Sequence, residues 1–301
     1  METLVKLIPV SSDLALYALI DLSIVVLLML LIKWLQEKFY SINVNEEISE
    51  KDNFAYGIGF SGGLFALCIV LSAVIGRHIQ QGVEKAAFGI FLFGIIGIVL
   101  IRVGRYIHDK VVLHRVDTPQ LLKEKNVGIA LVDAASVIAS AIILRSIILW
   151  VDGSDVNAVI AVISGYFVVL AISIVLTRFY EYRFALTNQN DSFQGALKRG
   201  QMAVAVDHAG NLLGTAMVVT TSETLLVYSS TAYVSNVTGW LFVSFALAVG
   251  LQIIVQIGKR ILLLGVDINR EIDQHHNMGI ACIGLVLNLG FAILITEFFS
   301  L

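Results

Sequence analysis

"NVGIALVDAASVIASAIILRSIILW", residues 126–150, is apolar over its whole length except for Asp133 and Arg145. A helix that crosses a bilayer needs about 20 mostly apolar residues, which this stretch supplies. A charged side chain at bilayer depth costs about 2.5–3.5 kcal/mol on insertion scales and usually faces the interior of a helix bundle. The stretch therefore predicts a membrane-spanning helix, and it leaves open whether Asp133 faces a partner side chain or water.

The composition of the whole chain agrees with a membrane location. The 301 residues are 57% hydrophobic and 14% charged, with a mean hydropathy of +0.86, whereas soluble proteins carry about 25% charged residues. Two prolines and 24 glycines favour helical spans over a β-barrel. A net charge of −3 gives no reason to expect a nucleic-acid partner. The lipid bilayer is the expected partner, and Cys68 and Cys282 are expected to be packing residues inside spans.

The length rule predicts an all-α integral membrane protein with eight spans and both termini on one side. The spans are expected near residues 14–38, 54–76, 86–111, 127–150, 156–180, 202–223, 235–262 and 278–299. Sixteen lysines and arginines lie in or beside the connections that follow odd spans, and three lie on the other side. Short cytoplasmic loops accumulate basic residues, so both termini are predicted to lie outside the cytoplasm.

Four similar stretches begin with an amide residue and open the even spans. The amides, called anchors below, are Asn53, Asn126, Gln201 and Asn277, and they lie 73, 75 and 76 residues apart. The stretches read "NFAYGIGFSGGLFA", "NVGIALVDAASVIA", "QMAVAVDHAGNLLG" and "NMGIACIGLVLNLG". A repeat of this kind predicts the architecture directly, here four helical hairpins.

Small residues recur at fixed positions after the anchors. The second and thirteenth positions are occupied by Ala55, Gly128, Ala203 and Gly279, and by Ala66, Ala139, Gly214 and Gly290. These positions are eleven residues apart, close to three helical turns, so they share one face of each helix. Small residues let helix backbones approach closely in lipid, and these faces are therefore predicted to be central helix contacts.

The second and fourth hairpins resemble each other, as do the first and third. The chain is therefore interpreted as two four-helix halves, residues 1–152 and 153–301. Because each half has an even number of spans, the halves insert in the same sense and are related by an axis along the membrane normal.

This pattern resembles the bacterial YjfL-like inner-membrane family, which is defined by domain of unknown function 350, in two tandem copies. The resemblance is carried by "EKDNFAYGIGFSGGL" at 50–64, "KEKNVGIALVDAA" at 123–135, "KRGQMAVAVDHAGNLLG" at 198–214 and "HHNMGIACIG" at 275–284. Gln201 departs from the asparagine of the other three units. The resemblance implies a bacterial inner-membrane location and supplies no activity and no catalytic residues.

Polar residues inside the even spans form a candidate site. Asp133, Asp207 and His208 are expected about 10 Å inside the cytoplasmic boundary at about 1.5 Å per residue. Ser136, Asn211 and Asn288 are expected one turn deeper. The functional interpretation is a proton or cation path or a substrate site, and the alternative is a hydrogen-bonded cluster that fixes the pairing of the halves. Asp207 and His208 are adjacent, so their side chains point about 100° apart.

A second charged layer is expected toward the outside, with members Asp21, Arg145, Glu223 and Glu297. Arg145 either pairs with one of the three acids or extends to the interface. Helix ends such as "LIKWLQEKFY" and "LTRFYEYRF" combine bases with aromatic residues, which predicts anchoring at the interface. The alternative is a docking surface for anionic lipid or a cytosolic partner.

Sequence motifs give little support to catalysis: the chain has no "GxxxxGK" or "HExxH" pattern, so an enzyme is not expected. His275 and His276 are weak evidence for a metal, and no metal or cofactor is predicted. Two hypotheses remain. The first is a channel or transporter for ions, protons or a small solute, with a path between the halves. The second is a non-transporting scaffold that recruits a cytosolic partner in envelope maintenance, and a homo-oligomer is compatible with both.

Overall fold

Eight long helices build the protein in the computed structural model, which describes residues 12–40, 42–75, 82–153, 155–188 and 191–300. They are α1 (Ser12–Tyr40), α2 (Phe54–Ser72), α3 (Val83–Ile107), α5 (Val127–Trp150), α6 (Val156–Thr187), α8 (Met202–Thr220), α10 (Tyr233–Leu262) and α12 (Met278–Phe299). Each is part of a segment long and apolar enough to cross a bilayer. The predicted all-α membrane architecture with eight spans is confirmed.

The bounds of the helices follow the hydropathy pattern, with differences at some ends. α5 and α12 cover the predicted residues, whereas α6 continues to Thr187 instead of ending at 180. α3 continues as the π-helix η3 (His108–Val112), and α8 is followed by α9 (Ser222–Leu225). α2 ends at Ser72, and the predicted end at Gly76 lies outside the described residues.

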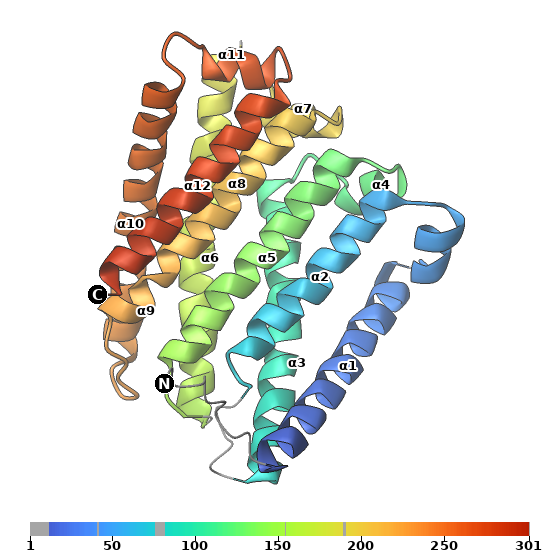
Figure 1. Cartoon of the computed structure of the whole chain (residues 1–301), viewed down its shortest axis with the longest axis vertical. Helices are drawn as coiled ribbons and strands as arrows, with labels where there is room; N and C mark the ends of the chain where they lie inside the picture. Colours follow the sequence, from blue (N-terminus) through green and yellow to red (C-terminus); the bar gives the residue numbers. More distant parts are fainter. Residues whose placement is uncertain (1–11, 41, 76–81, 154, 189–190, 301) are drawn as a thin grey trace, which may run out of the picture.

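Each link between an odd and an even span contains a short helix, where the sequence predicted only a polar link. These are η1 (Glu46–Glu50), α4 (Thr118–Lys123), α7 (Phe193–Lys198) and α11 (Ile268–Asp273), and they lie together at what we call the short-helix end of the molecule (Figure 1). The side chains of Asp117, Ser192 and Asp267 accept hydrogen bonds from backbone N–H groups in the first turns of α4, α7 and α11. Such caps stabilise a helix start by about 1 kcal/mol.

The anchors cap the long even helices in the same way. Asn53, Asn126 and Asn277 each accept a hydrogen bond from the backbone N–H three residues later. Gln201 makes no such cap, and its Oε1 is buried without a hydrogen-bond partner among the described residues. The longer glutamine side chain thus loses the bond that asparagine makes.

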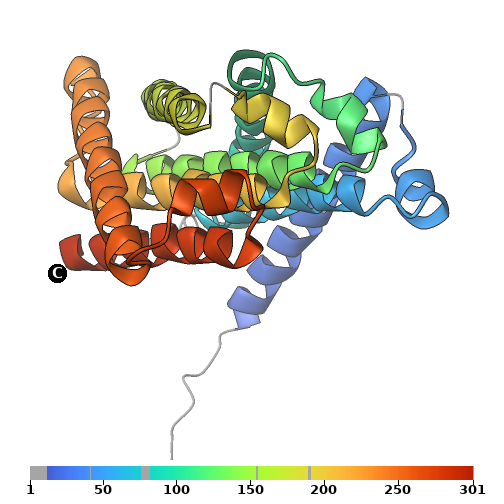
Figure 2. The ribbon, with the colours of Figure 1, turned by 90° about the horizontal axis from the view of Figure 1, so that it is seen from above.

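The four even helices form one parallel row in the order α2, α5, α8, α12 (Figures 1 and 2). All four begin at the short-helix end because each follows one of the short helices. α3 packs against both α2 and α5, α6 against α5 and α8, and α10 against α8 and α12. α1 packs against α2 and α3. The two halves therefore insert in the same sense and join at the contact between α5 and α8.

Small residues let the row helices approach each other closely. A Cβ atom added to Gly62 of α2 would lie 2.8 Å from the Cβ of Ala134 in α5. A Cβ added to Gly210 of α8 would lie 2.5 Å from the Cα of Leu285 in α12. The predicted small-residue faces of α2, α5 and α8 therefore lie at the contacts between row helices, where dispersion contacts between backbones stabilise packing in lipid. On α12 the prediction is wrong, because Gly279 and Gly290 contact no other described helix.

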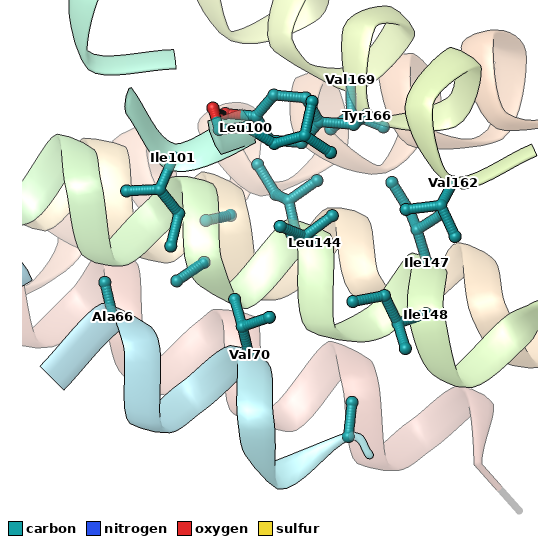
Figure 3. Packing of buried hydrophobic residues seen from close by; sticks show 14 of the residues in the cluster. Ala66, Val70, Leu100, Ile101, Leu144, Ile147, Ile148, Val162, Tyr166 and Val169 are labelled. Carbon is teal, nitrogen blue, oxygen red and sulfur yellow. Dashed lines mark hydrogen bonds between the residues drawn. The ribbon is translucent and has the colours of Figure 1, made fainter. Parts of the chain in front are cut away.

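Apolar side chains fill the half of the interior that lies away from the short-helix end. Leu144, Ile147 and Ile148 of α5 lie among residues of α2, α3 and α6 (Figure 3). Tyr166 of α6 crosses this cluster, and its hydroxyl donates to the Leu100 carbonyl at 3.0 Å. The polar residues of the candidate site therefore lie in the other half, toward the short-helix end.

Candidate functional site

Two buried ion pairs lie near the short-helix end, one in each half. Arg105 of α3 contacts Asp133 of α5 with its Nη2 2.8 Å from Oδ2. Lys259 of α10 contacts Asp207 of α8 with its Nζ 2.6 Å from Oδ1. Asp133 has 0% exposure, and Asp207 and Lys259 are also buried. Asp133 therefore faces a partner side chain rather than water.

The two pairs occupy corresponding places, but the carboxylate comes from a different helix of the row. In the first half the carboxylate is that of Asp133 in α5, seven residues after the anchor of α5. It lies against Gly59 of α2, six residues after the anchor of α2. In the second half the acid is Asp207 at the sixth position, and it lies against Gly284 at the seventh. A Cβ at Gly59 would lie 3.2 Å from Asp133 Oδ2, and a Cβ at Gly284 would overlap Asp207 Oδ1. Each glycine makes room for the opposite carboxylate.

Asp207 has a second partner that Asp133 lacks. The hydroxyl of Tyr180 in α6 donates to Asp207 Oδ2 at 3.2 Å, while Lys259 bonds to Oδ1. Asp133 Oδ1 is buried and has no hydrogen-bond partner among the described residues. Tyr180 and Lys259 were not predicted as site residues, because both lie at helix ends where the sequence indicated interfacial anchoring.

His208 points away from its neighbour Asp207, as the geometry of adjacent helical residues requires. Its ring packs against the rings of Tyr180 and Phe193, with centroid distances of 5.0 Å and 4.7 Å. Its ring nitrogens, like those of buried His108 in η3, have no hydrogen-bond partner within the part of the chain that the structure describes. His208 therefore belongs to an aromatic contact and not to the ion pair beside it.

A polar cavity of about 250 Å³ reaches the second ion pair. It lies among α6, α8, α10, α11 and α12, all in the second half. Asp207, Lys259 and Tyr180 line its middle section. Its other polar lining residues are Arg183, Arg260, Asp267, Asn269 and Asp273 toward α11, Thr187 and Gln256, and Asn211, Gln252 and Asn288 deeper in the row. Asp133 lines neither this cavity nor the smaller one described next.

The deeper polar residues of the sequence prediction divide between two cavities. Asn211 lines both the large cavity and a cavity of about 40 Å³ between the halves, which Ser136 also lines. Gln252 of α10 donates to Asn211 Oδ1 at 2.5 Å. Asn288 lines the large cavity and donates to the carbonyl of Gly284 at 2.9 Å. Asn211 is thus the predicted residue that connects the second-half cavity to the contact between the halves.

The comparison with protein families identifies the two halves. A family model described as Domain of Unknown Function (DUF350) matches residues 9–148 and again residues 154–299. The chain belongs to the DUF350 family. Two tandem DUF350 copies thus account for nearly the whole chain, and each contains four of the spanning helices. No curated protein and no solved structure matches the chain.

The outer charged residues of this DUF350 chain do not form a cluster among the described residues. Arg145 donates from Nε to the hydroxyl of Ser72 at 3.0 Å, and its charge also attracts the carboxylate of Glu223, with no ion-pair contact between the two. Glu223 accepts a hydrogen bond from a serine hydroxyl of α5 at 2.8 Å. Asp21 is buried in α1, and Glu297 is exposed in the last turns of α12. In the predicted outer layer, Arg145 and Glu223 thus interact electrostatically, whereas Asp21 and Glu297 lie apart from them.

The surface at the short-helix end carries further acidic groups. His275 Nδ1 lies 2.9 Å from Glu271 Oε1, and within the described ranges no three metal-ligating side chains gather. Asp273 lies at the mouth of the large cavity and accepts a hydrogen bond from Asn188. Burial raises the pKa of Asp273 to about 6, although the bond from Asn188 acts in the opposite direction. The mouth of the cavity therefore contains a carboxyl group whose pKa is raised above its ordinary value.

Proposed function

We propose that this chain is a gated transporter that takes a proton or a small polar solute from the cytoplasm. The observation that carries the proposal is the polar cavity of about 250 Å³ that leads from the short-helix end to the buried Asp207–Lys259 pair. The excess of basic residues assigns the short-helix end to the cytoplasm. The proposed entry is therefore the cavity mouth at α11.

The depth of the cavity supports transport more than simple packing. Asp207 lies six residues and Asn211 ten residues after the anchor, or about 9 Å and about 15 Å along α8 at 1.5 Å per residue. Ionisable groups at this depth are costly in a bilayer and commonly mark substrate or ion pathways. The path in this proposal runs through the second half, then past Asn211 to the contact between the halves.

The lining indicates the chemistry of the solute. Three bases and three acids line the cavity: Arg183, Lys259, Arg260, Asp207, Asp267 and Asp273. At about 30 Å³ per water molecule, 250 Å³ corresponds to roughly eight waters. A mixed-charge cavity of this size suits a small zwitterion or a hydrated ion better than an apolar molecule.

The filled interior at the opposite end makes an open channel the less suitable mechanism. Buried Leu144, Ile147 and Trp240 belong to the apolar cluster there, and the cavity does not pass through them. Passage in this proposal therefore requires a second conformation in which this cluster opens, in addition to the one with a cavity at the short-helix end.

Flux into proteoliposomes tests the proposal. The panel contains protons, Na⁺, K⁺ and small zwitterions such as free amino acids. The double variant Asp207→Asn/Lys259→Met removes both charges of the cavity pair, so we expect it to lose flux. The matched control, Asp133→Asn/Arg105→Met, removes the corresponding ion pair outside the cavity and should retain most of the flux.

Two results would contradict transport. One is no flux of any panel member by the folded wild type. The other is equal loss of flux in the cavity variant and in the control, because that would assign both pairs to folding alone. Folding is checked in each case by the melting temperature in detergent.

The second candidate is a scaffold that recruits a cytosolic partner without transporting. The observation that favours it is that both ion pairs are closed, with distances of 2.8 Å and 2.6 Å, beneath an apolar end that is packed. Exposed Trp34, Phe39 and Tyr182 near the short-helix end would then serve docking. A wild type without flux that retains a specific soluble partner, lost when these aromatics are replaced by alanine, would favour this function.

A further inference from the structure

The row of even helices has two edges, α2 and α12, and its three internal contacts use one register. Gly62 of α2 meets Ala134 of α5, and Gly210 of α8 meets Leu285 of α12. In both contacts the ninth position after one anchor meets the eighth position after the next. The same geometry is therefore repeated along the row.

The rest of the register follows from the other close contacts. Taken together, these contacts place positions 2, 6, 9 and 13 of a row helix against positions 1, 4, 7, 8 and 11 of the next. A Cβ on Gly128, at position 2 of α5, would lie 3.5 Å from the Cβ of Ala205, at position 4 of α8. A Cβ on Gly214, at position 13 of α8, would lie 2.9 Å from the Cβ of Asn288, at position 11 of α12.

Both edges of the row present the matching positions without a partner helix among the described residues. The positions on α12 are Gly279, Ile283, Val286 and Gly290, and those on α2 are Phe54, Gly57, Phe60, Ser61 and Leu64. Val286 is 63% exposed and Phe54 is 69% exposed. No atom lies within 4 Å of a Cβ built on Gly57 or Gly290. The outward face of α12 thus has the residues that meet a following helix elsewhere in the row.

The anchor amides give a second, independent observation. The Asn53 amide donates to the Leu122 carbonyl at 2.9 Å, and the Asn126 amide donates to the Leu197 carbonyl at 3.2 Å, in each case to the next repeat. Asn53 also donates to Glu47 of its own repeat at 3.0 Å. Asn277 makes only this second type of bond among the described residues, to Glu271 at 3.0 Å. Among the described residues, Asn277 makes no bond that corresponds to those from Asn53 and Asn126 to the next repeat.

The odd helices show the same incompleteness. α3, α6 and α10 each pack against two successive row helices, whereas α1 packs against α2 alone within the row. A repeat placed before α2 would supply the second neighbour. The helix that fits this place by register is α12 of another molecule.

We propose that a second copy of this chain continues the row, so that α12 of one copy packs side by side with α2 of the next. Asn277 of the first copy then donates to a carbonyl in the last turn of η1 of the second. In the α2–α5 and α8–α12 contacts, positions 6 and 7 hold the ion-paired aspartate and the glycine that faces it. At the proposed contact these positions are occupied by Ile283 and Phe60, so no charge is buried between copies. Such a contact between different surfaces closes into a ring or extends as a linear array. It does not depend on the proposed transport.

Disulfide cross-linking in a bilayer tests the contact. In a background with Cys68→Ala and Cys282→Ala, the variants Ser61→Cys and Val286→Cys are made in separate chains. These are the eighth and ninth positions, equivalent to Ala134 and Gly62. We expect a disulfide-linked dimer when the two variants are reconstituted together and oxidised, and none when either is oxidised alone.

The control replaces Val286→Cys by Ile253→Cys, which lies on α10 at similar depth and is 55% exposed. Three results would overturn the proposal: no dimer in the mixture, equal dimer with the Ile253 variant, or dimers formed by one variant alone. The last result would indicate a two-fold arrangement of α2 with α2 or of α12 with α12.

A steric variant gives a second measurement. Gly57→Ile adds a side chain at position 4 of α2, where no atom of the same molecule lies within 4 Å. In the proposed contact, this position meets α12 of the other copy. We expect it to remove most of the cross-linked product. Gly63→Ile places the same side chain into open space on another side of α2 and should leave cross-linking unchanged. Equal cross-linking in both variants would contradict the proposed contact.

Discussion

Moving the carboxylate of Asp207 from α8 to α12 should transfer the ion pair with Lys259 and not abolish it. The double variant Asp207→Gly/Gly284→Asp gives the second half the arrangement of the first, where glycine lies on the earlier row helix and aspartate on the later one. The structure provides the room, because a Cβ at position 284 would lie 2.9 Å from Lys259 Nζ. The flexible end of the lysine can shift to pair with the new carboxylate.

The magnitudes follow from the burial of the pair. Asp207→Gly leaves Lys259 buried without its carboxylate, which should cost about 3–5 kcal/mol, and glycine inside a helix adds about 1 kcal/mol. Gly284→Asp alone should also destabilise, because the new side chain overlaps the Asp207 carboxylate and brings a like charge. The double variant restores one carboxylate beside one amine. We therefore expect a favourable coupling energy of about 2–3 kcal/mol between the two substitutions.

The assay is reversible unfolding in mixed micelles for the wild type, both single variants and the double variant. The mirror-image exchange in the first half, Gly59→Asp/Asp133→Gly, serves as the matched experiment beside Arg105. If the losses of the two single variants simply add in the double variant, the correspondence between the two pairs is wrong.

Three further outcomes are expected. Gly62→Ala should destabilise the protein by about 1–3 kcal/mol in the same unfolding assay, because the new Cβ would lie 2.8 Å from that of Ala134, whereas Gly63→Ala, with open space around it, should not. Gln201→Asn should restore the missing helix cap and raise the free energy of unfolding by about 0.5–1 kcal/mol; an unchanged value would refute this account of the cap. Burial raises the pKa of Asp273 in the folded protein to about 6. The stability that this carboxyl group contributes should therefore be lost as the pH rises from the ordinary aspartate pKa through about 6. Stability of the wild type relative to Asp273→Asn, measured across this range, should therefore fall, and a flat difference would exclude the shift.

The sequence was sufficient to predict the spans and the repeat, because both depend on local properties. Apolar length predicted α5 and α12 to the residue, and the recurring anchors predicted where the even helices begin. The spacing of small residues predicted the faces with which α2, α5 and α8 meet the next row helix, but not the face of α12 that meets α8. The short helices were missed although Asp117, followed by a proline in the first turn of α4, is a recognisable start signal.

The partners of the buried acids could not be predicted in the same way. Arg105 and Lys259 lie near helix ends, where a cation usually extends to the interface, so the sequence indicated membrane orientation and not an ion pair. Alignment by anchors also matched Asp133 with His208, because both are at position 7. Neighbouring row helices are offset, so that position 7 of one helix lies against position 6 of the previous helix. Only this offset shows that Asp133 and Asp207 are counterparts.

The exchange of acid and glycine between the halves shows why a tandem chain differs from two identical copies. Two identical four-helix units would have to place the carboxylate on the same helix and would have the same surroundings at both pairs. In the tandem chain, Asp133 lies in a contact without a large cavity, whereas Asp207 has Tyr180 and Lys259 as partners and lies against the polar cavity. Under the proposed function, one pair holds the helices together while the other lines the cavity that receives the solute. This division of roles depends on residues that differ between the two halves.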